Sequence, residues 1–265
     1  MSERIASERN VSAQFGRGRT RPERVALVTG STSGIGAAVA RRLARDGYTV
    51  ALHGRRPEEA VAPMLAGLPG ASYHRVDLAD PAEAGRLVRE VIVRHGRLDA
   101  LVNNAGETSV VPHADLKAAT PALWHRMVDV NLIAPWLLIA EAEAALRTSA
   151  EQGRPASIVN IGSHAGYRPK GASIPYATAK AALHHVTRLL ALTLAPAIRV
   201  NCVAPGLVDT PMSAGWEASY ALWNAKAPMR RSARPEDIAD LVAALTSNDY
   251  VTGEIVIADG GLNLT

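Results

Sequence analysis

From residue 24 onward, short apolar runs of the chain alternate with longer amphipathic stretches. The runs predict seven strands: RVALVTG, YTVALHG, ASYHRVDL, LDALVNNAG, ASIVNIGS, AIRVNCVAPG and EIVIADGG. The stretches between them predict helices over 34–47, 58–68, 81–96, 115–149, 174–195 and 235–247, and we expect Pro63 to kink or shorten the second. Apolar strands that alternate with helices are typical of a parallel sheet covered on both faces. The sequence therefore predicts a doubly wound α/β fold with a mostly parallel, seven-stranded sheet.

Composition and charge limit the domain organisation and exclude several classes of partner. No repeat or linker-like composition interrupts residues 24–265, so we expect one domain there, preceded by a flexible basic arm over residues 1–23. The net charge is +4; residues 1–24 hold six arginines and three glutamates, which leaves about +1 for the rest. This balance predicts no nucleic-acid interface. The apolar runs are shorter than the ~20 residues of a spanning helix, and the N-terminus lacks a secretory apolar core, so we expect a cytoplasmic protein with no membrane contact.

Metal and disulfide chemistry are also not expected. The one cysteine, Cys202, excludes an intramolecular disulfide and a cysteine-cluster metal site. The eight histidines show no metal-ligand spacing. His184 and His185 are adjacent, cannot share a helix face, and are predicted to be structural.

A glycine cluster lies directly between the first strand and the first helix, in TGSTSGIG. Gly30, Gly34 and Gly36 allow a tight turn and a close approach to a pyrophosphate, which the helix N-terminus attracts. A plain tight turn would use the same residues, but this position in an alternating α/β pattern favours dinucleotide binding on a Rossmann fold.

The end of the second strand bears on which dinucleotide is bound. An NAD site places an acid there, whereas an NADP site places cations near the 2′-phosphate. Here the chain reads LHGRRPEE, with Arg55 and Arg56 and no acid at the tip, so NADP(H) is preferred and NAD(H) remains possible. The alternative is that both arginines are solvated loop residues. Asp77, after the third strand, either reaches the adenine or caps the following helix.

A tyrosine and a lysine stand four residues apart in YATAK, at the head of an apolar helical run. Tyr176 and Lys180 therefore share a helix face. An ammonium about 4 Å from the phenol, at an effective dielectric constant of ~20, would lower the pKa of the phenol by about three. Ser163 ends the fifth strand, and the NNAG turn and the APG turn follow two others. Since ligands bind at the carboxyl ends of parallel strands, we expect these groups to gather at one site.

Together these motifs resemble the short-chain dehydrogenase/reductase family in its compact, single-domain form, close to 3-oxoacyl reductase-like carbonyl reductases. The resemblance runs from about residue 24 to the C-terminus and includes TGSTSGIG, NNAG, Asn131, Ser163, YATAK, RVNCVAPG and VTGEIVIADGG in order. It implies that Tyr176 is the general acid and base and that Lys180 holds the nicotinamide ribose. It implies that Ser163 orients the substrate oxygen, and that Asn131 positions a water that links Lys180 to solvent. The predicted cofactor contacts are Gly30, Ser31, Thr32, Ser33, Gly34, Ile35, Gly36, Arg55, Arg56, Asp77, Leu78, Asn104, Ala105, Gly106, Tyr176, Lys180, Pro205, Gly206, Val208 and Thr210.

The resemblance also places a substrate-covering lid around residues 207–230. Trp216, Tyr220 and Trp223 are spaced as one helix face, which predicts either an aromatic ceiling over a bulky apolar or aromatic ketone, or a packing or subunit contact. We predict substrate contacts from Ser163, His164, Tyr176, Trp216 and Tyr220. Glu107, after NNAG, recognises a polar substrate group or meets solvent. The segment PWLLIAEA lacks the arginine that carrier-protein reductases often present after the tetrad asparagine, which weakens a carrier-protein interpretation.

The leading hypothesis is an NADPH-dependent oxidoreductase that reduces a ketone to a secondary alcohol, reversibly. The alternatives are an NAD-dependent alcohol dehydrogenase and a non-catalytic NADP-binding redox sensor; retention of all four tetrad positions disfavours the sensor. The resemblance implies a homo-oligomer, a tetramer or dimer, built on the long helices around 115–149 and 174–195. The expected ligands are therefore a nicotinamide cofactor and a small carbonyl or alcohol substrate.

Overall fold

The computed structural model describes residues 24–265, and the predicted arm over residues 1–23 lies outside them. Within the described residues the strands form one parallel sheet in the order β3-β2-β1-β4-β5-β6-β7. The strands are β1 (Arg24–Val28), β2 (Tyr48–Gly54), β3 (Ser72–Arg75), β4 (Ala100–Asn103), β5 (Ala156–Ile161), β6 (Ile198–Pro205) and β7 (Ile255–Ala258). This architecture confirms the predicted α/β Rossmann fold. The strand order reverses between β1 and β4, where a doubly wound sheet opens its binding crevice.

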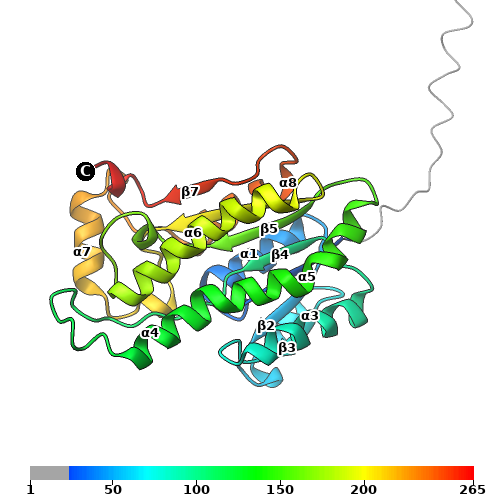
Figure 1. The fold of residues 1–265 in the computed structure, drawn as a ribbon, viewed down its shortest axis with the longest axis horizontal. Coiled ribbons are helices and arrows are strands. Elements are labelled where there is room, and N and C mark those ends of the chain that lie inside the picture. The colour runs from blue at the N-terminus through cyan, green and yellow to red at the C-terminus, as the bar shows by residue number, and fades with distance from the viewer. Residues whose placement is uncertain (1–23) are drawn as a thin grey trace, which may run out of the picture.

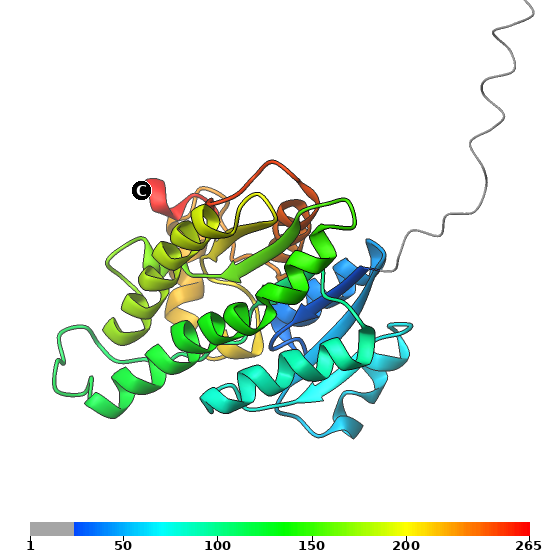
Figure 2. The ribbon, with the colours of Figure 1, turned by 45° about the vertical axis from the view of Figure 1, so that its right-hand side comes forward.

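Helices cover both faces of the sheet, in two layers that Figures 1 and 2 show. The front layer in Figure 1 contains α3, α5 and α6, whose apolar residues share one buried cluster with one face of the strands. The rear layer contains α1 and α8, which pack in a second cluster on the opposite face. The helices are α1 (Gly34–Arg45), α2 (Ala62–Ala66), α3 (Pro81–His95), α4 (Pro121–Val128), α5 (Ala134–Ala150), α6 (Ile174–Leu194), α7 (Glu217–Lys226) and α8 (Pro235–Ser247).

Side-chain caps and prolines account for where several helices begin. Asp80 accepts a hydrogen bond from the amide of Ala82 at the start of α3, and Pro81 occupies the first position, where no amide donor is needed. Ser173 accepts one from the amide of Tyr176 at the start of α6, at 3.4 Å. The cap thus fixes the turn that carries the predicted catalytic tyrosine.

Two predicted helices differ from the structure. The helix expected over 58–68 is only a 3₁₀ turn, Glu58–Ala60, followed by α2, as Pro63 suggested. The helix expected over 115–149 begins at Pro121 and contains a π-helical turn, Asp129–Ile133, between α4 and α5. Pro135 has no amide hydrogen to donate to the carbonyl of residue 131, which breaks the regular α-helical pattern at this turn.

No helix among residues 24–265 is long and apolar enough to cross a membrane.

Candidate active site

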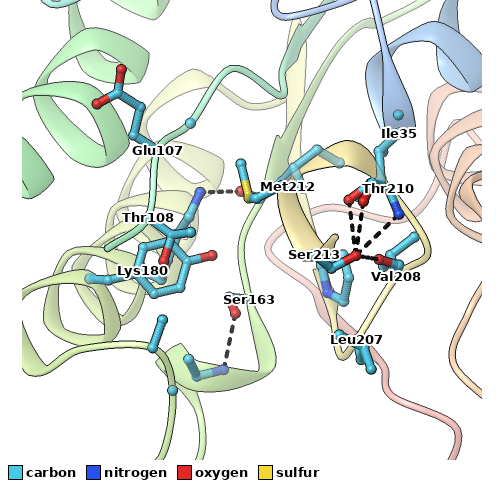
Figure 3. Close-up of a pocket in the computed structure, with 18 of the residues that line it drawn as sticks. Ile35, Glu107, Thr108, Ser163, Lys180, Leu207, Val208, Thr210, Met212 and Ser213 are labelled. Carbon is cyan, nitrogen blue, oxygen red and sulfur yellow. Dashed lines mark hydrogen bonds between the residues drawn. The ribbon is translucent and has the colours of Figure 1, made fainter. Parts of the chain in front are cut away.

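A cavity of about 1500 Å³ lies at the carboxyl ends of the strands. Its walls are the glycine loop after β1, the loops after β4, β5 and β6, the start of α6, and the segment from Leu207 to Lys226. Figure 3 shows Ser163 and Lys180 on one side of this space and the turn from Thr210 to Ser213 on the other. The sheet register explains why these loops meet. Val28 of β1 is level with Leu52 of β2 and Val102 of β4, so the loops that follow the three strands leave the sheet side by side.

The glycine loop has the conformation that a bound pyrophosphate needs. Gly30 and Gly34 have positive φ angles of 62° and 52°, a region that glycine enters readily. The N-terminus of α1 has no side-chain cap, and Ser33, Gly34 and Ile35 line the cavity, so the free amides of the helix are available to an anion. These features fit the pyrophosphate of a dinucleotide.

Two predicted cofactor contacts, Ser31 and Gly36, do not line the cavity and act structurally instead. Ser31 is fully buried, and its hydroxyl accepts a hydrogen bond from the amide of His53 at 2.9 Å. Gly36 packs against the loop itself: a Cβ there would lie 2.3 Å from the carbonyl oxygen of Gly30 and 2.5 Å from Asn104 Nδ2. Only glycine fits this contact, so Gly36 sets the spacing between helix and loop.

His53, at the end of β2, holds the glycine loop in a way that sequence analysis missed. Its Nδ1 accepts a hydrogen bond from the amide of Gly30 at 3.0 Å, so Nε2 carries the hydrogen and donates to the carbonyl of Val76 at 3.2 Å. Burial lowers the pKa of His53 to about 4. The ring is therefore neutral at physiological pH, as an acceptor at Nδ1 must be.

The four residues of the predicted tetrad all line the cavity. Lys180 is buried, and its Nζ donates to the carbonyl oxygen of Ile161 at 2.8 Å and lies 5.9 Å from the centre of the Tyr176 ring. Ser163 Oγ accepts a hydrogen bond from the amide of Ala165 at 3.1 Å, which leaves its own hydrogen available for donation.

Asn131 occupies the π-helical turn and presents an unpaired oxygen. Its Nδ2 donates to the carbonyls of Met127 and Glu107, each at 3.0 Å. Its Oδ1 is buried and has no partner among the described residues, and the amide group as a whole is fully buried. Near it, a Cβ on Gly106 would lie 2.9 Å from that oxygen and 3.6 Å from Lys180 Nζ. An unpaired buried acceptor this close to the lysine fits the predicted water site.

The predicted effect of Lys180 on the phenol is wrong for the protein's own groups. Burial raises the pKa of Tyr176, and the hydroxyl of Ser163 acts in the opposite direction without reversing it. Burial also lowers the pKa of Lys180 to about 8. The ammonium donates to the carbonyl of Ile161, and desolvation of the phenol is the largest influence on its pKa.

His184, predicted to be structural, contacts the loop after β5. It lies on α6, and its Nε2 accepts a hydrogen bond from the amide of Ser163 at 3.4 Å. Burial, and then the charges of Lys180 and Arg188, lower the pKa of His184 to about 4. A chain of buried hydrogen bonds also fixes α6 on the sheet, from Asn103 through Asn160 to Thr187.

The end of the cavity beside the tip of β2 carries two arginines and two acids. Arg55 and Arg56 both line it, as predicted. Glu107 also lines the cavity and is ion-paired there: it accepts two hydrogen bonds from Arg126, at 2.6 and 2.7 Å, and one from Arg55 Nη1 at 3.0 Å. The hydrogen bond from Arg126 is the main reason that the pKa of Glu107 is lowered. Asp77 lines the cavity and does not cap α3, which Asp80 does.

The opposite end combines aromatic residues from the segment 216–226 with the loop after β5. Trp216 and Trp223 line the cavity, and His164 meets Trp223 edge to face with ring centres 5.9 Å apart. Tyr220 is a correction: it does not line the cavity, and its hydroxyl instead bonds to Ser213 at 2.9 Å and to Asp209 at 3.2 Å. The predicted aromatic face is thus split. Trp216 precedes the first turn of α7, and the hydroxyl of Tyr220 meets the turn that contains Ser213.

Comparison with known proteins gives the family. A family model described as enoyl-(acyl carrier protein) reductase matches residues 30–263. A Streptomyces violaceoruber protein, named as a proposed ketoacyl reductase 2 of the granaticin polyketide synthase, is 45% identical over 243 residues, or 91% of this chain and 96% of that protein. The chain is a member of the short-chain dehydrogenase/reductase family. It is accordingly an NAD(P)-dependent oxidoreductase, as the resemblance implied.

Solved structures of this fold hold either nicotinamide cofactor. A blue fluorescent protein from a metagenomic library, in complex with NADPH, is 36% identical with a TM-score of 0.79, covering 90% of this chain and 97% of that one. A 3-ketoacyl-(acyl-carrier-protein) reductase from Brucella melitensis, in complex with NADH, is 29% identical with a TM-score of 0.81, covering 90% and 98%. A nicotinamide cofactor is therefore established for this short-chain reductase fold.

Among residues 24–265, no group of three or more His, Cys, Asp or Glu side chains is arranged to hold a metal ion.

Proposed function

We propose that the protein is an NADPH-dependent reductase that converts a ketone to a secondary alcohol. The observation that carries this proposal is that Ser163, Tyr176, Lys180 and Asn131 line the same cavity as the glycine loop. A ketone held there meets two hydroxyl groups that can donate hydrogen bonds, those of Ser163 and Tyr176.

In this proposal each residue acts on one atom of the reaction. Reduced nicotinamide, when bound, supplies the hydride to the carbonyl carbon. Ser163 donates a hydrogen bond to the carbonyl oxygen, and Tyr176 Oη transfers its proton to that oxygen as negative charge develops. Lys180 Nζ, near the phenol, stabilises the resulting phenolate. Asn131 Oδ1 holds a water that returns a proton to Lys180 and so to Tyr176.

The raised pKa of Tyr176 is consistent with the reducing direction. A phenol that stays protonated at neutral pH is a competent acid, and the reduction consumes that proton. The positive charge of oxidised nicotinamide would favour the phenolate in the reverse reaction. The charge of the cofactor therefore links the pKa of Tyr176 to the direction of the reaction.

Preference for NADP(H) rests on Arg55 and Arg56 at the tip of β2. We infer that they bind the 2′-phosphate, which competes with Glu107 for Arg55. The test compares KM values for NADPH and NADH in Arg55→Ala/Arg56→Ala, with the exposed Arg41→Ala as the matched control. We expect KM for NADPH to rise at least about tenfold and KM for NADH to change little, since each charged hydrogen bond is worth about 1.5–3 kcal/mol. Equal effects on both cofactors would contradict this assignment.

The substrate is proposed to be a bulky apolar or aromatic ketone, because Trp216 and Trp223 line its end of a large cavity. The name of the 45% identical relative points the same way, to ketoacyl chains of a polyketide synthase. An enoyl thioester belongs in the assay too, since the family model's description names that reaction. Segment 207–230 is proposed as the lid over this end.

The implied homo-oligomer remains a prediction. Trp136 on α5 and Leu189 and Leu192 on α6 are large apolar residues that are exposed in the single chain, and these two helices lie side by side in Figures 1 and 2. Light scattering measures the mass directly.

A further inference from the structure

His164 lies where three parts of the fold meet. It follows Ser163, its ring contacts Trp223 of α7, and its Nδ1 lies 2.9 Å from Asp259 Oδ2, beyond β7. Both partners of this pair are buried, with His164 7% exposed and Asp259 5% exposed. A histidine beside the substrate-orienting serine is thus anchored from two sides.

The pair with Asp259 determines which ring nitrogen can act. Asp259 is itself held by the amides of Gly261, at 3.0 Å, and Asn263, at 2.7 Å, so its carboxylate cannot rotate freely. A carboxylate at Nδ1 keeps a hydrogen on that nitrogen, which leaves Nε2 as the nitrogen that can meet a ligand. The edge-to-face contact with Trp223 fixes the tilt of the ring.

The other nitrogen is open to the cavity. No residue among 24–265 forms a hydrogen bond with His164 Nε2, yet this atom is not fully buried. Solvent therefore reaches Nε2, and His164 lines the cavity. By contrast, Arg168, on the same loop, has its guanidinium engaged by the carbonyls of Leu262 and Thr265.

We propose that His164 is a specificity-determining residue whose Nε2 forms a hydrogen bond with a hydroxyl group of the substrate. This inference rests on the proposed ketone reduction at Ser163 and Tyr176. Ser163 and His164 are adjacent in the chain and both line the cavity, so the carbonyl and the hydroxyl belong to one substrate. The substrate class is therefore a hydroxyketone.

The chemistry of the pair suits a hydroxyl group as its ligand. With Nδ1–H donated to Asp259, Nε2 is the one ring nitrogen left for a ligand, and a hydroxyl can both donate and accept a hydrogen bond. A site that binds a hydroxyl discriminates against the analogue that lacks it, because the nitrogen of the site is then desolvated without a partner.

The test uses a matched pair of ketones, 2-hydroxyacetophenone and acetophenone, with NADPH as reductant. We expect the wild type to favour the hydroxyketone by about tenfold in kcat/KM, and His164→Phe to bring that ratio close to one. Asp259→Asn should reduce the ratio in part, since an amide fixes the tautomer less strictly. His125→Phe, a histidine on α4 outside the cavity lining, is the control and should keep the wild-type ratio.

The test distinguishes a failure of this inference from a failure of the proposed function. An unchanged ratio in His164→Phe, or an equal loss for both ketones, means that His164 only packs, and the inference falls while ketone reduction stands. If the wild type reduces neither ketone, the proposed function is in question, and ¹⁵N NMR of His164 in the protein with NADPH gives the answer by itself. A shift of the Nε2 resonance with 2-hydroxyacetophenone but not with acetophenone supports the inference. The absence of such a difference overturns it.

Discussion

Acid should destabilise this protein through the two buried histidines that support its site. His53 holds the glycine loop and His184 holds the amide of Ser163, and both rings are nearly inaccessible, at 3% and 5% exposed. Each has a pKa lowered from 6.5 to about 4, mainly by burial. In the window between these values the unfolded chain binds more protons than the folded protein. The free energy of unfolding therefore falls as the pH drops from 6.5 towards 4.

The size of the effect follows from the two pKa values. At pH 5.5 each histidine costs about 1.4 kcal/mol relative to neutral pH, and the pair about 2.8 kcal/mol. Below pH ~4.5 the carboxylates begin to protonate, including Glu107, whose pKa is lowered and whose ion pairs are then lost. The interval from pH 6.5 to 5 thus isolates the histidines best from the acids.

The assay is urea denaturation followed by tryptophan fluorescence between pH 7.5 and 5. Other histidines titrate in the same range, so the decisive comparison is between variants. His53→Gln and His184→Gln should each remove about 1.4 kcal/mol of the loss between pH 7.5 and 5.5. His185→Gln, which changes the exposed neighbour of His184 on the same helix, should leave the slope as in the wild type. Wild-type slopes in the His53 and His184 variants would refute the assignment of both rings as buried and neutral.

Two further changes test other parts of the site. Gly36→Ala forces a Cβ within 2.3 Å of a backbone oxygen, so we expect loss of cofactor binding and a lower Tm, both measured by calorimetry with and without NADPH. The control is Gly67→Ala, whose Cβ would lie 3.6 Å from the carbonyl oxygen of Met64, and we expect it to bind NADPH normally. Normal NADPH affinity in Gly36→Ala would contradict the packing argument. Glu107→Gln releases Arg55 from its partially exposed ion pair, which is worth about 0.2–1 kcal/mol. We therefore expect Kd for NADPH to fall by up to about fivefold, while Kd for NADH stays nearly constant. Weaker NADPH binding would show that Glu107 instead holds Arg55 in its binding position.

The strand and helix pattern could be predicted from sequence because each element has a local signal. The seven apolar runs, Asp80 before Pro81, and the effect of Pro63 on the helix around it all depend on near neighbours. The π-helical turn at Asn131 was not predicted, although Pro135 four residues later is the signal that would have indicated a break.

The site was predictable where a motif carries it and not where distant residues meet. The glycine loop and the tetrad residues line the cavity as expected. The pair of His164 with Asp259 joins residues 95 positions apart, and no sequence spacing indicates it. The prediction that Tyr220 contacts the substrate was wrong for another reason. Its spacing placed it with Trp216 on one face, but α7 begins only after Trp216 and the phenol has polar partners nearby.

The expected pKa of Tyr176 illustrates a third limit. Sequence spacing gave the neighbour correctly but not the desolvation of both groups, which depends on how the loops close over them. Electrostatic balance in a buried site is a property of the whole surrounding structure.

The measurement that tests the central claim most directly is NADPH oxidation by the wild type and by Tyr176→Phe over a panel of aromatic, aliphatic, sugar-like and β-keto carbonyls. We predict turnover of at least one bulky ketone by the wild type. Tyr176→Phe should lose it by at least about a hundredfold, the contribution of a positioned general acid, while Kd for NADPH stays within a few-fold. Equal turnover in the two proteins would show that Tyr176 does not deliver the proton and would contradict the account.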